Sequence, residues 1–512
     1  MKLFAVFSNH QQFLSASTTD ASTIMTQPTT WTKTMAASMT SYIDAGSIVA
    51  GAAGLSLWDS YLNMYENPIR IHFDLPFNIV IPYIWTHGLD FWTISTISFI
   101  VSKLGLLGAC SSNALSAAVG ALIGGRICDL YGRKVVYTYD LLFYILGMLL
   151  IVFGVNYPML LVGYIIVGLS VGADVAASWT LIAENAPAEN RARHCGTAQL
   201  MWALGPAVVL LLSAILSSFG FGLLGNRIVF AHLVVIAFIT WLMRLTMPES
   251  EEWIRNKKKE QELINSGQWK KTSYWDLFTN PANLRGIFLL IGIYMIWNLA
   301  AGTGGFFLPY IYKTVGGVSD AVSQGLTSLL FIASIFSTLF IFMTLADKYS
   351  RRLIYCVIAC LYIAAWGLLL LPVGFLGTKI SFTSIIITPT TGESYCLSFS
   401  FGICVFVLAS ILMGINNGSG QQAFYQMWGA EMFPARYRAA AQGFSFFAAR
   451  FALSIWSYLV PVIIGSDAGG MPIAAAILVT FATISMLVGT IFCPNTAGKT
   501  LEQIEEERYG KS

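Results

Sequence analysis

Long apolar stretches alternate with short charged segments along most of this 512-residue chain. About twelve of these stretches are long enough, as helices, to cross roughly 30 Å of hydrocarbon. The pattern therefore predicts an all-α membrane protein with twelve transmembrane helices. The expected spans are 34–58, 97–125, 134–155, 158–183, 196–218, 228–247, 284–311, 323–345, 353–373, 399–429, 439–464 and 471–492.

Two charged signatures each occur twice, in the same order. DLYGRKVVY begins at Asp129 and DKYSRRLIY begins at Asp347. AENAPAENRA begins at Ala183 and AEMFPARYRA begins at Ala430. A membrane chain built from two similar halves, with charged hinges at matching places, is organised like a secondary transporter.

The repeat predicts two six-helix bundles joined by a charged linker, and it sets the expected domain boundaries. These are a polar N-terminal tail over 1–33, an N-terminal six-helix bundle over 34–248, a cytoplasmic linker over 249–283, a C-terminal six-helix bundle over 284–492 and a cytoplasmic tail over 493–512.

Composition agrees with a membrane protein and excludes several function classes. The chain is 56% hydrophobic and 11% charged, whereas a soluble protein carries about 25% charged residues. The net charge is only +3, and no basic block suggests a nucleic-acid partner. The eight cysteines are scattered and lack metal-site spacing, so we expect neither a metal nor a cofactor.

The basic residues predict the orientation in the membrane. Most of the 29 Lys and Arg lie in the segments after spans two, four, six, eight and ten and in the C-terminal tail. By the positive-inside rule these segments face the cytoplasm, so both termini are expected to be cytoplasmic. We expect a multi-pass protein of the cell membrane, with the lipid bilayer as its surroundings.

Four motifs resemble those of the major facilitator superfamily, and of its sugar porter branch in particular. They are GGRICDLYGRK from Gly124, PESEEW from Pro248, the AENAPAENR and AEMFPARYR pair, and GKTLEQIEEE from Gly498. The stretch Gln426–Pro461 looks most like bacterial polyol and inositol transporters. The resemblance implies a monomeric transporter that works by alternating access, rather than an enzyme.

The chain also departs from the branch pattern. Proton-coupled members pair an aspartate on span one with an arginine on span four; Asp44 matches the aspartate, but Tyr164 stands at the arginine position. Trp297 and Asn298 stand near the place of the paired glutamines expected on span seven, and Gln426 stands where span ten usually has tryptophan. The resemblance to the sugar porter branch therefore does not imply hexose specificity for this chain, and it does not imply the usual aspartate–arginine pair for proton coupling.

Ionisable residues inside a bilayer are expensive and are functional candidates by default. Asp44 lies eleven residues beyond Lys33, and Asp174 lies ten residues before Glu184, which places both carboxylates about 15 Å deep. Two close carboxylates cannot both ionise cheaply. We expect Asp44 and Asp174 to share a proton and couple transport to it; the alternative is a neutral Asp174 that caps backbone groups. The sequence assigns no partner to Arg244.

A glycine-interrupted polar segment in span ten, GINNGSGQQAFYQ from Gly414, is expected to line a watery cavity. Amides donate and accept hydrogen bonds, which suits a hydroxylated solute; the alternative is that the small residues serve helix packing. The expected substrate-binding residues are Gln199, Asn298, Asn417, Gln421, Gln422, Gln426 and Trp428.

The repeated charged loops are expected to act as gates, because charge-assisted pairs can hold the inner side closed and break when it opens. The alternative is that these charges only fix the orientation. The gating candidates are Asp129, Arg133, Lys134, Glu184, Arg191, Asp347, Arg351, Arg352, Glu431 and Arg438.

The sequence as a whole predicts a proton-coupled symporter of a small polyhydroxylated solute, either a sugar, a polyol or inositol. An uncoupled facilitator is the nearest alternative, and a non-transporting nutrient sensor is the alternative from another class. The sequence leaves open the solute, the coupling ion and the direction of transport.

Overall fold

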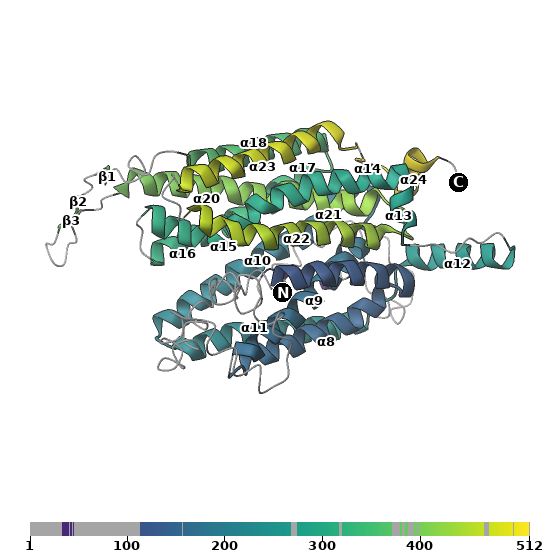
Figure 1. The fold of residues 1–512 in the computed structure, drawn as a ribbon, viewed down its shortest axis with the longest axis horizontal. Coiled ribbons are helices and arrows are strands. Elements are labelled where there is room, and N and C mark those ends of the chain that lie inside the picture. The colour runs from purple at the N-terminus through teal and green to yellow at the C-terminus, as the bar shows by residue number, and fades with distance from the viewer. Residues whose placement is uncertain are drawn as a thin grey trace, which may run out of the picture.

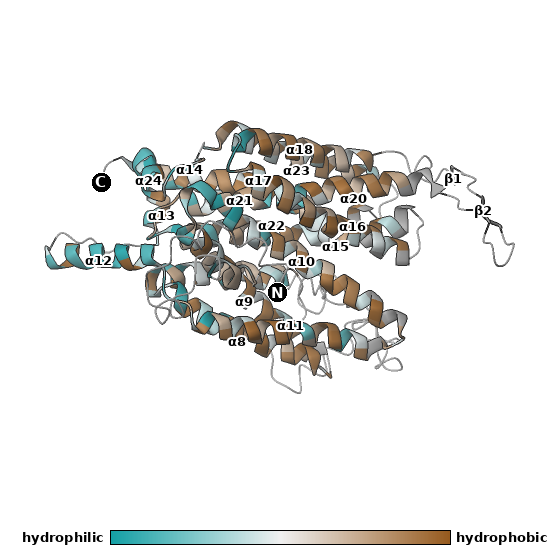
Figure 2. Ribbon diagram, turned by 180° about the vertical axis from the view of Figure 1, so that it is seen from behind, coloured by the Kyte–Doolittle hydropathy of each residue, from teal (hydrophilic) through white to brown (hydrophobic). Residues whose placement is uncertain are grey.

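The computed structural model describes residues 33–39, 41–43, 45, 113–155, 157–267, 274–316, 320–370, 379–380, 385–387, 394–396, 399–464, 470–494 and 496–510. Within these residues, nine helices are long and apolar enough to cross a membrane. Figure 2 shows that the long helices are mainly apolar, whereas α12 (Glu251–Asn265) and α24 (Leu501–Tyr509) are polar.

The first half of the chain is a group of long helices. Residues 33–39 and 41–43 are helical, and Asp44 lies outside the described residues. The helices that follow are Asn113–Tyr131, α8 (Arg133–Val152), α9 (Tyr157–Asn185), the short 3₁₀ turn η1 (Ala188–Asn190), α10 (Arg191–Ser218) and α11 (Gly222–Leu245).

The segment expected to link the halves carries α12 and the short α13 (Asp276–Thr279). Ser250 begins α12 because its side chain accepts a hydrogen bond from the Trp253 amide. In Figure 1, α12 projects from one end of the bundle, the end at which α13 and α24 also lie. We call this the α12 end.

The second half is also a group of long helices. It contains two π-helical turns and one break, between α20 and α21. Its elements are α14 (Pro281–Leu290), η2 (Ile291–Met295), α15 (Ile296–Gly316), α16 (Asp320–Ser337), η3 (Thr338–Phe342), α17 (Met343–Leu345), α18 (Arg351–Leu368), α20 (Phe401–Ser419), α21 (Gln421–Glu431), α22 (Arg438–Ile464) and α23 (Gly470–Phe492). Such π-turns inside helices are frequent at functional sites.

Four short strands lie between α18 and α20, at the opposite end from α12 (Figure 1). They are β1 (Lys379–Ile380), β2 (Ile385–Ile387), β3 (Ser394–Cys396) and β4 (Phe399–Ser400). β1 pairs antiparallel with β4, and β2 pairs antiparallel with β3, Ile386 opposite Tyr395. The sequence analysis did not predict these strands.

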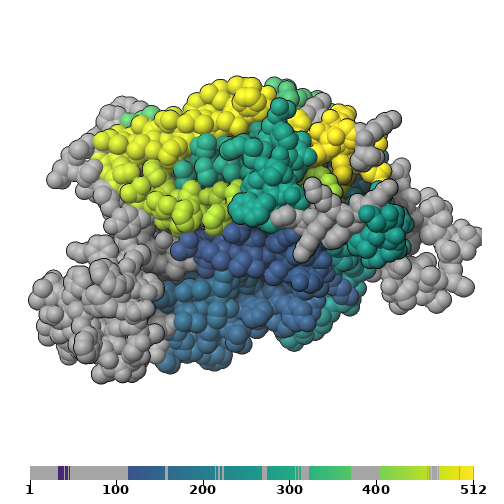
Figure 3. All heavy atoms as spheres, turned by 45° about the vertical axis from the view of Figure 1, so that its right-hand side comes forward, coloured from purple at the N-terminus to yellow at the C-terminus, as the bar shows by residue number. Residues whose placement is uncertain are grey.

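The two halves form two stacked layers, which the colours of Figures 1 and 3 separate. Within the first layer α8 packs against α9 and α11, and within the second α18 packs against α20 and α23. Contacts between the layers run mainly through α10 against α16 and α22 against α9. The halves therefore meet along a small number of helices.

Two predicted span boundaries were wrong. The helix of the span expected to end at residue 125 continues to Tyr131 and ends at the Gly132 turn, where the backbone adopts a positive φ. The span expected over 399–429 is broken at Gly420, where α20 ends and α21 begins. The amide-rich α21 is therefore a helix separate from α20.

Helix Asn113–Tyr131 packs against α9 at van der Waals distance through glycines spaced by four residues. A Cβ on Gly168 would lie 2.0 Å from Ser116 Oγ, and one on Gly172 would lie 2.0 Å from the carbonyl oxygen of Ala117. Small residues at this spacing let two membrane helices approach closely.

We therefore predict that Gly172→Ala lowers the thermal unfolding midpoint of the purified protein, because overpacking costs about 1–3 kcal/mol. Gly325→Ala is the matched control, since nothing lies within 4 Å of its added Cβ. Thermal unfolding in detergent measures both variants. Equal midpoints would contradict close packing of these two helices.

Candidate functional site

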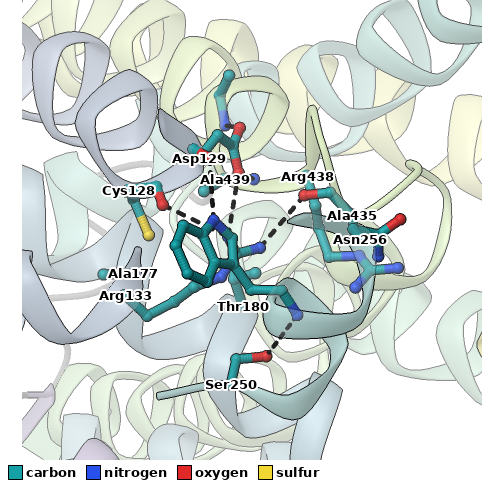
Figure 4. Close-up of polar contacts among 12 residues, drawn as sticks. Cys128, Asp129, Arg133, Ala177, Thr180, Ser250, Asn256, Ala435, Arg438 and Ala439 are labelled. Carbon is teal, nitrogen blue, oxygen red and sulfur yellow. Dashed lines mark hydrogen bonds and ion pairs between the residues drawn. The ribbon is translucent and has the colours of Figure 1, made fainter. Parts of the chain in front are cut away.

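A buried cluster of four charges joins the halves at the α12 end. Glu184 Oε1 lies 2.7 Å from Arg133 Nη2 and 2.9 Å from Arg438 Nη1. Asp129 lies 3.6 Å from Arg133, and its carboxylate accepts from the backbone amides of Ala439 at 3.3 Å and Ala440 at 2.8 Å. Figure 4 shows Asp129, Arg133 and Arg438 converging. One glutamate thus holds an arginine from each half.

A second cluster repeats this geometry with the halves exchanged. Glu431 Oε1 lies 3.0 Å from Arg351 Nη1 and 3.0 Å from Arg191 Nη1. Asp347 lies 3.3 Å from Arg351, and it accepts 3.1 Å hydrogen bonds from the first amides of α10. The repeat in the sequence is therefore also a repeat in space.

The aspartates cap helices that belong to the opposite half. Asp129 receives the first free amides of α22, and Asp347 receives those of α10. The first amides of a helix have no partner within it and carry partial positive charge. A carboxylate from the other half satisfies both needs, so opening the α12 end would leave both helix starts uncapped.

The backbone is close-packed beside the first cluster. A Cβ on Gly443 would lie 2.3 Å from the carbonyl oxygen of Ala121, and one on Gly125 would lie 2.5 Å from that of Ala439. Arg133, Arg351 and Arg438 are at most 1% exposed. The clusters are therefore dry, and their charges are compensated by one another rather than by water.

Residues around α12 support the first cluster. Glu249 accepts 3.0 Å hydrogen bonds from the backbone amides of Arg133 and Lys134, and Ser250 Oγ donates to Glu184 at 2.5 Å. The Trp253 indole N–H donates to the carbonyl oxygen of Asp129 at 3.0 Å. The start of α12 is thus tied to the cluster.

Eight of the ten gating candidates meet in the two clusters. Lys134 is held through its backbone amide, and Arg352 Nε donates to the carbonyl oxygen of Cys493. Among the described ion pairs, neither side chain takes part. Both residues are exposed, whereas the arginine before each of them is buried.

A third buried charge cluster lies within the first half, and the sequence analysis was wrong to leave Arg244 without a partner. Arg244 Nη1 lies 2.7 Å from Asp174 Oδ1 and 3.3 Å from Asp140 Oδ2. Ser178 accepts from Arg244 at 3.0 Å and donates to Asp174 at 2.8 Å. The Tyr137 ring lies under the guanidinium, at 4.2 Å.

Asp140 was missed, although a charged residue inside an apolar run was sufficient signal. Asp140 lies beside Asp174, because both contact the same guanidinium. The arrangement places two carboxylates around one guanidinium.

A cavity of about 100 Å³ lies between the halves. Its walls include Trp202, Trp297, Asn298, Asn417, Gln422 and Arg450. Asn298 Oδ1 and Gln422 Nε2 are buried and have no hydrogen-bond partner among the described residues. Unsatisfied buried polar atoms are costly, so these two atoms are suited to a hydroxylated ligand.

Four of the expected substrate-binding residues do not line this cavity. Gln199 donates to the carbonyl oxygen of Asn417 at 2.5 Å and accepts from Gln426 at 3.1 Å. Gln421 accepts from Asn416 at 2.6 Å. Trp428 is fully buried and packs on Phe424 at 4.9 Å. Even so, Gln421 Nε2, Gln426 Oε1 and Trp428 Nε1 are buried without a hydrogen-bond partner among the described residues.

The chain resembles known transporters over most of its length. The family profile described as "Sugar (and other) transporter" matches residues 100–507. The minor myo-inositol transporter IolF of Bacillus subtilis (strain 168) is 47% identical over 93% of this chain and 94% of its own. The glucose transporter GlcP of Staphylococcus epidermidis is 26% identical over 78% of this chain and 87% of its own.

A solved structure has the same fold. It is that of the proton:xylose symporter XylE, from the major facilitator superfamily, bound to 6-bromo-6-deoxy-D-glucose. It matches with a TM-score of 0.66 over 93% of this chain and 98% of that chain, at 18% identity.

We predict that Glu184→Gln loosens the start of α22 and that Glu431→Gln loosens the start of α10. Each change leaves two buried arginines without their shared carboxylate, which costs about 3–5 kcal/mol. Hydrogen exchange read by mass spectrometry should rise in the first turn of the named helix.

Glu502→Gln is the control, because its pair with Arg255 is more than half exposed on both sides. Unchanged exchange in both glutamate variants would contradict a role of the clusters in holding the halves together.

Proposed function

Because the chain belongs to the sugar transporter family of the major facilitator superfamily, we propose that it carries a small polyhydroxylated solute across the cell membrane by alternating access. The solute is a sugar, a polyol or inositol, and inositol is favoured by the 47% identity to the B. subtilis inositol transporter. The main support for the proposal is the cavity between the halves, in which the buried amide atoms Asn298 Oδ1 and Gln422 Nε2 have no hydrogen-bond partner among the described residues.

The all-α, twelve-helix fold expected from the sequence is confirmed by its likeness to a major facilitator structure. The chain is a multi-pass membrane transporter and not an enzyme. Both halves of a single chain contribute to the cavity, so a monomer is sufficient for the proposed transport.

The cavity chemistry fits a hydroxylated ring. A hydroxyl both donates and accepts, and it can therefore satisfy the acceptor of Asn298 and the donor of Gln422. The indole faces of Trp202 and Trp297 suit the apolar face of such a ring. A purely apolar solute would leave the amides unpaired.

The two ion clusters fit an inner gate. The charge distribution of the sequence assigns the α12 end to the cytoplasm, and both clusters cross between the halves there. Opening the cavity to the cytoplasm requires both clusters to break together, which favours a rocking of one bundle against the other. Both termini are cytoplasmic in this arrangement.

Proton coupling is the more specific part of the proposed function. Asp44 is the aspartate that the family resemblance assigns to coupling, and Asp174 shares Arg244 with Asp140. Two carboxylates on one guanidinium offer a place for one proton. The alternative, an uncoupled facilitator of the same solutes, differs only in whether these carboxylates exchange protons during the cycle.

We predict that Asn298→Ala and Gln422→Ala each weaken binding of the transported solute by roughly one order of magnitude, because a substrate hydroxyl loses its partner. Gln261→Ala, an exposed amide on α12, is the control. Equilibrium binding of labelled inositol and glucose to purified protein measures all three. Parent-like affinity in both cavity variants would place the solute elsewhere.

Coupling is tested by Asp44→Asn and Asp174→Asn in proteoliposomes. We expect Asp44→Asn to abolish accumulation driven by a proton gradient while sparing solute exchange, because exchange needs no net proton movement. Asp174→Asn should show a milder loss, since Asp140 remains beside Arg244. If Asp44→Asn still concentrates solute, that residue is not essential for coupling. If the parent ignores the gradient, the facilitator is correct.

A further inference from the structure

Arg450 is a buried arginine in the wall of the cavity. It lies twelve residues beyond Arg438 on α22, about 18 Å from the start of that helix. It is 5% exposed and lines the cavity beside Asn298 and Gln422. The sequence analysis did not select it, although a charge inside an apolar run was again sufficient signal.

Arg450 differs from the other buried arginines of the described part of the chain. Each of the others forms an ion pair with a carboxylate; these are Arg133, Arg191, Arg244, Arg351 and Arg438. No carboxylate lies within 4.0 Å of Arg450 among the described ion pairs, and its Nε has no hydrogen-bond partner. A buried cation without a partner is costly, so its retention here requires an explanation.

Aromatic rings hold the guanidinium in place. Its Cζ lies 4.8 Å from the Phe446 ring centre and 5.8 Å from that of Trp202. Trp202 belongs to α10, so the two rings come from different halves. Stacking fixes the plane of a guanidinium but uses none of its N–H groups. The donors at its edge therefore remain available to the cavity.

We propose that Arg450 recognises the transported solute by donating two hydrogen bonds to a pair of adjacent oxygen atoms. The planar fork of a guanidinium matches two oxygens side by side. Two neighbouring hydroxyls on a ring polyol present such a pair, and so does the carboxylate of a sugar acid. Asn298 and Gln422 then bind the remaining hydroxyls, so the inference rests on the proposed function and narrows its substrate class.

The test compares Arg450→Gln and Arg450→Lys with the parent and with Arg255→Gln, a control arginine whose side chain is 54% exposed. Purified full-length protein binds labelled inositol in competition with monodeoxy-inositols, glucose and glucuronate. Thermal unfolding of each variant reports whether it remains folded.

We expect Arg450→Gln to weaken the best-bound solute by roughly ten- to hundredfold. Arg450→Lys should not restore it, because an ammonium group lacks the fork. One monodeoxy-inositol should bind the parent and Arg450→Gln equally well, which identifies the contacted hydroxyl. If glucuronate instead competes best in the parent and loses this advantage in Arg450→Gln, the oxygen pair is a carboxylate.

Two results would overturn the inference, and they are distinguishable. Suppose that Arg450→Gln binds every solute with the affinity of the parent while Asn298→Ala binds solute more weakly. The cavity then binds the solute, but Arg450 does not contact it. If the parent binds none of these solutes, the proposed function fails and the role of Arg450 fails with it. If Arg450→Gln does not fold, Arg450→Lys is compared with the parent across the monodeoxy-inositols instead. Weakened binding of every solute but one then supports the inference, and parent-like binding of all of them contradicts it.

Discussion

The arrangement of this protein depends on buried arginines that must find a carboxylate across the interface between its halves. Glu184 and Glu431 each hold one arginine of their own half and one of the other half. Removing Glu184 would leave the buried Arg438 without its ion pair, and removing Glu431 would do the same to Arg191. Because the two clusters repeat one geometry, the same interaction joins the halves twice at the α12 end.

This interaction is possible because the backbones around it approach so closely. Gly443 and Gly125 bring α22 and helix Asn113–Tyr131 into direct contact, which excludes water and aligns the first amides of α22 with Asp129. Charge pairing, helix capping and close packing therefore reinforce one another. A movement that breaks one of them breaks all three, which is expected of a gate with two discrete states.

Much of this could be predicted from the sequence, because repeated motifs report repeated contacts. The two charged signatures identified the residues of both clusters, and the apolar stretches identified the helices. The depth of a residue follows from its position along a helix, but the direction of its side chain does not. Gln421 and Gln426 form hydrogen bonds with Asn416 and Gln199 and do not line the cavity, and Arg244 was left without its partners on α8 and α9. Asp140 and Arg450 lie in apolar runs outside the repeated motifs, so no motif identified them.

We propose that the two clusters hold the α12 end closed. Pulsed electron paramagnetic resonance can measure the distance between spin labels at Tyr131 and Lys348, which are exposed beside the two clusters on opposite halves, in a chain whose eight native cysteines are replaced by alanine. The account predicts that combining Glu184→Gln with Glu431→Gln shifts the distribution to longer distances than in the parent. An unchanged distribution in the double variant would contradict it.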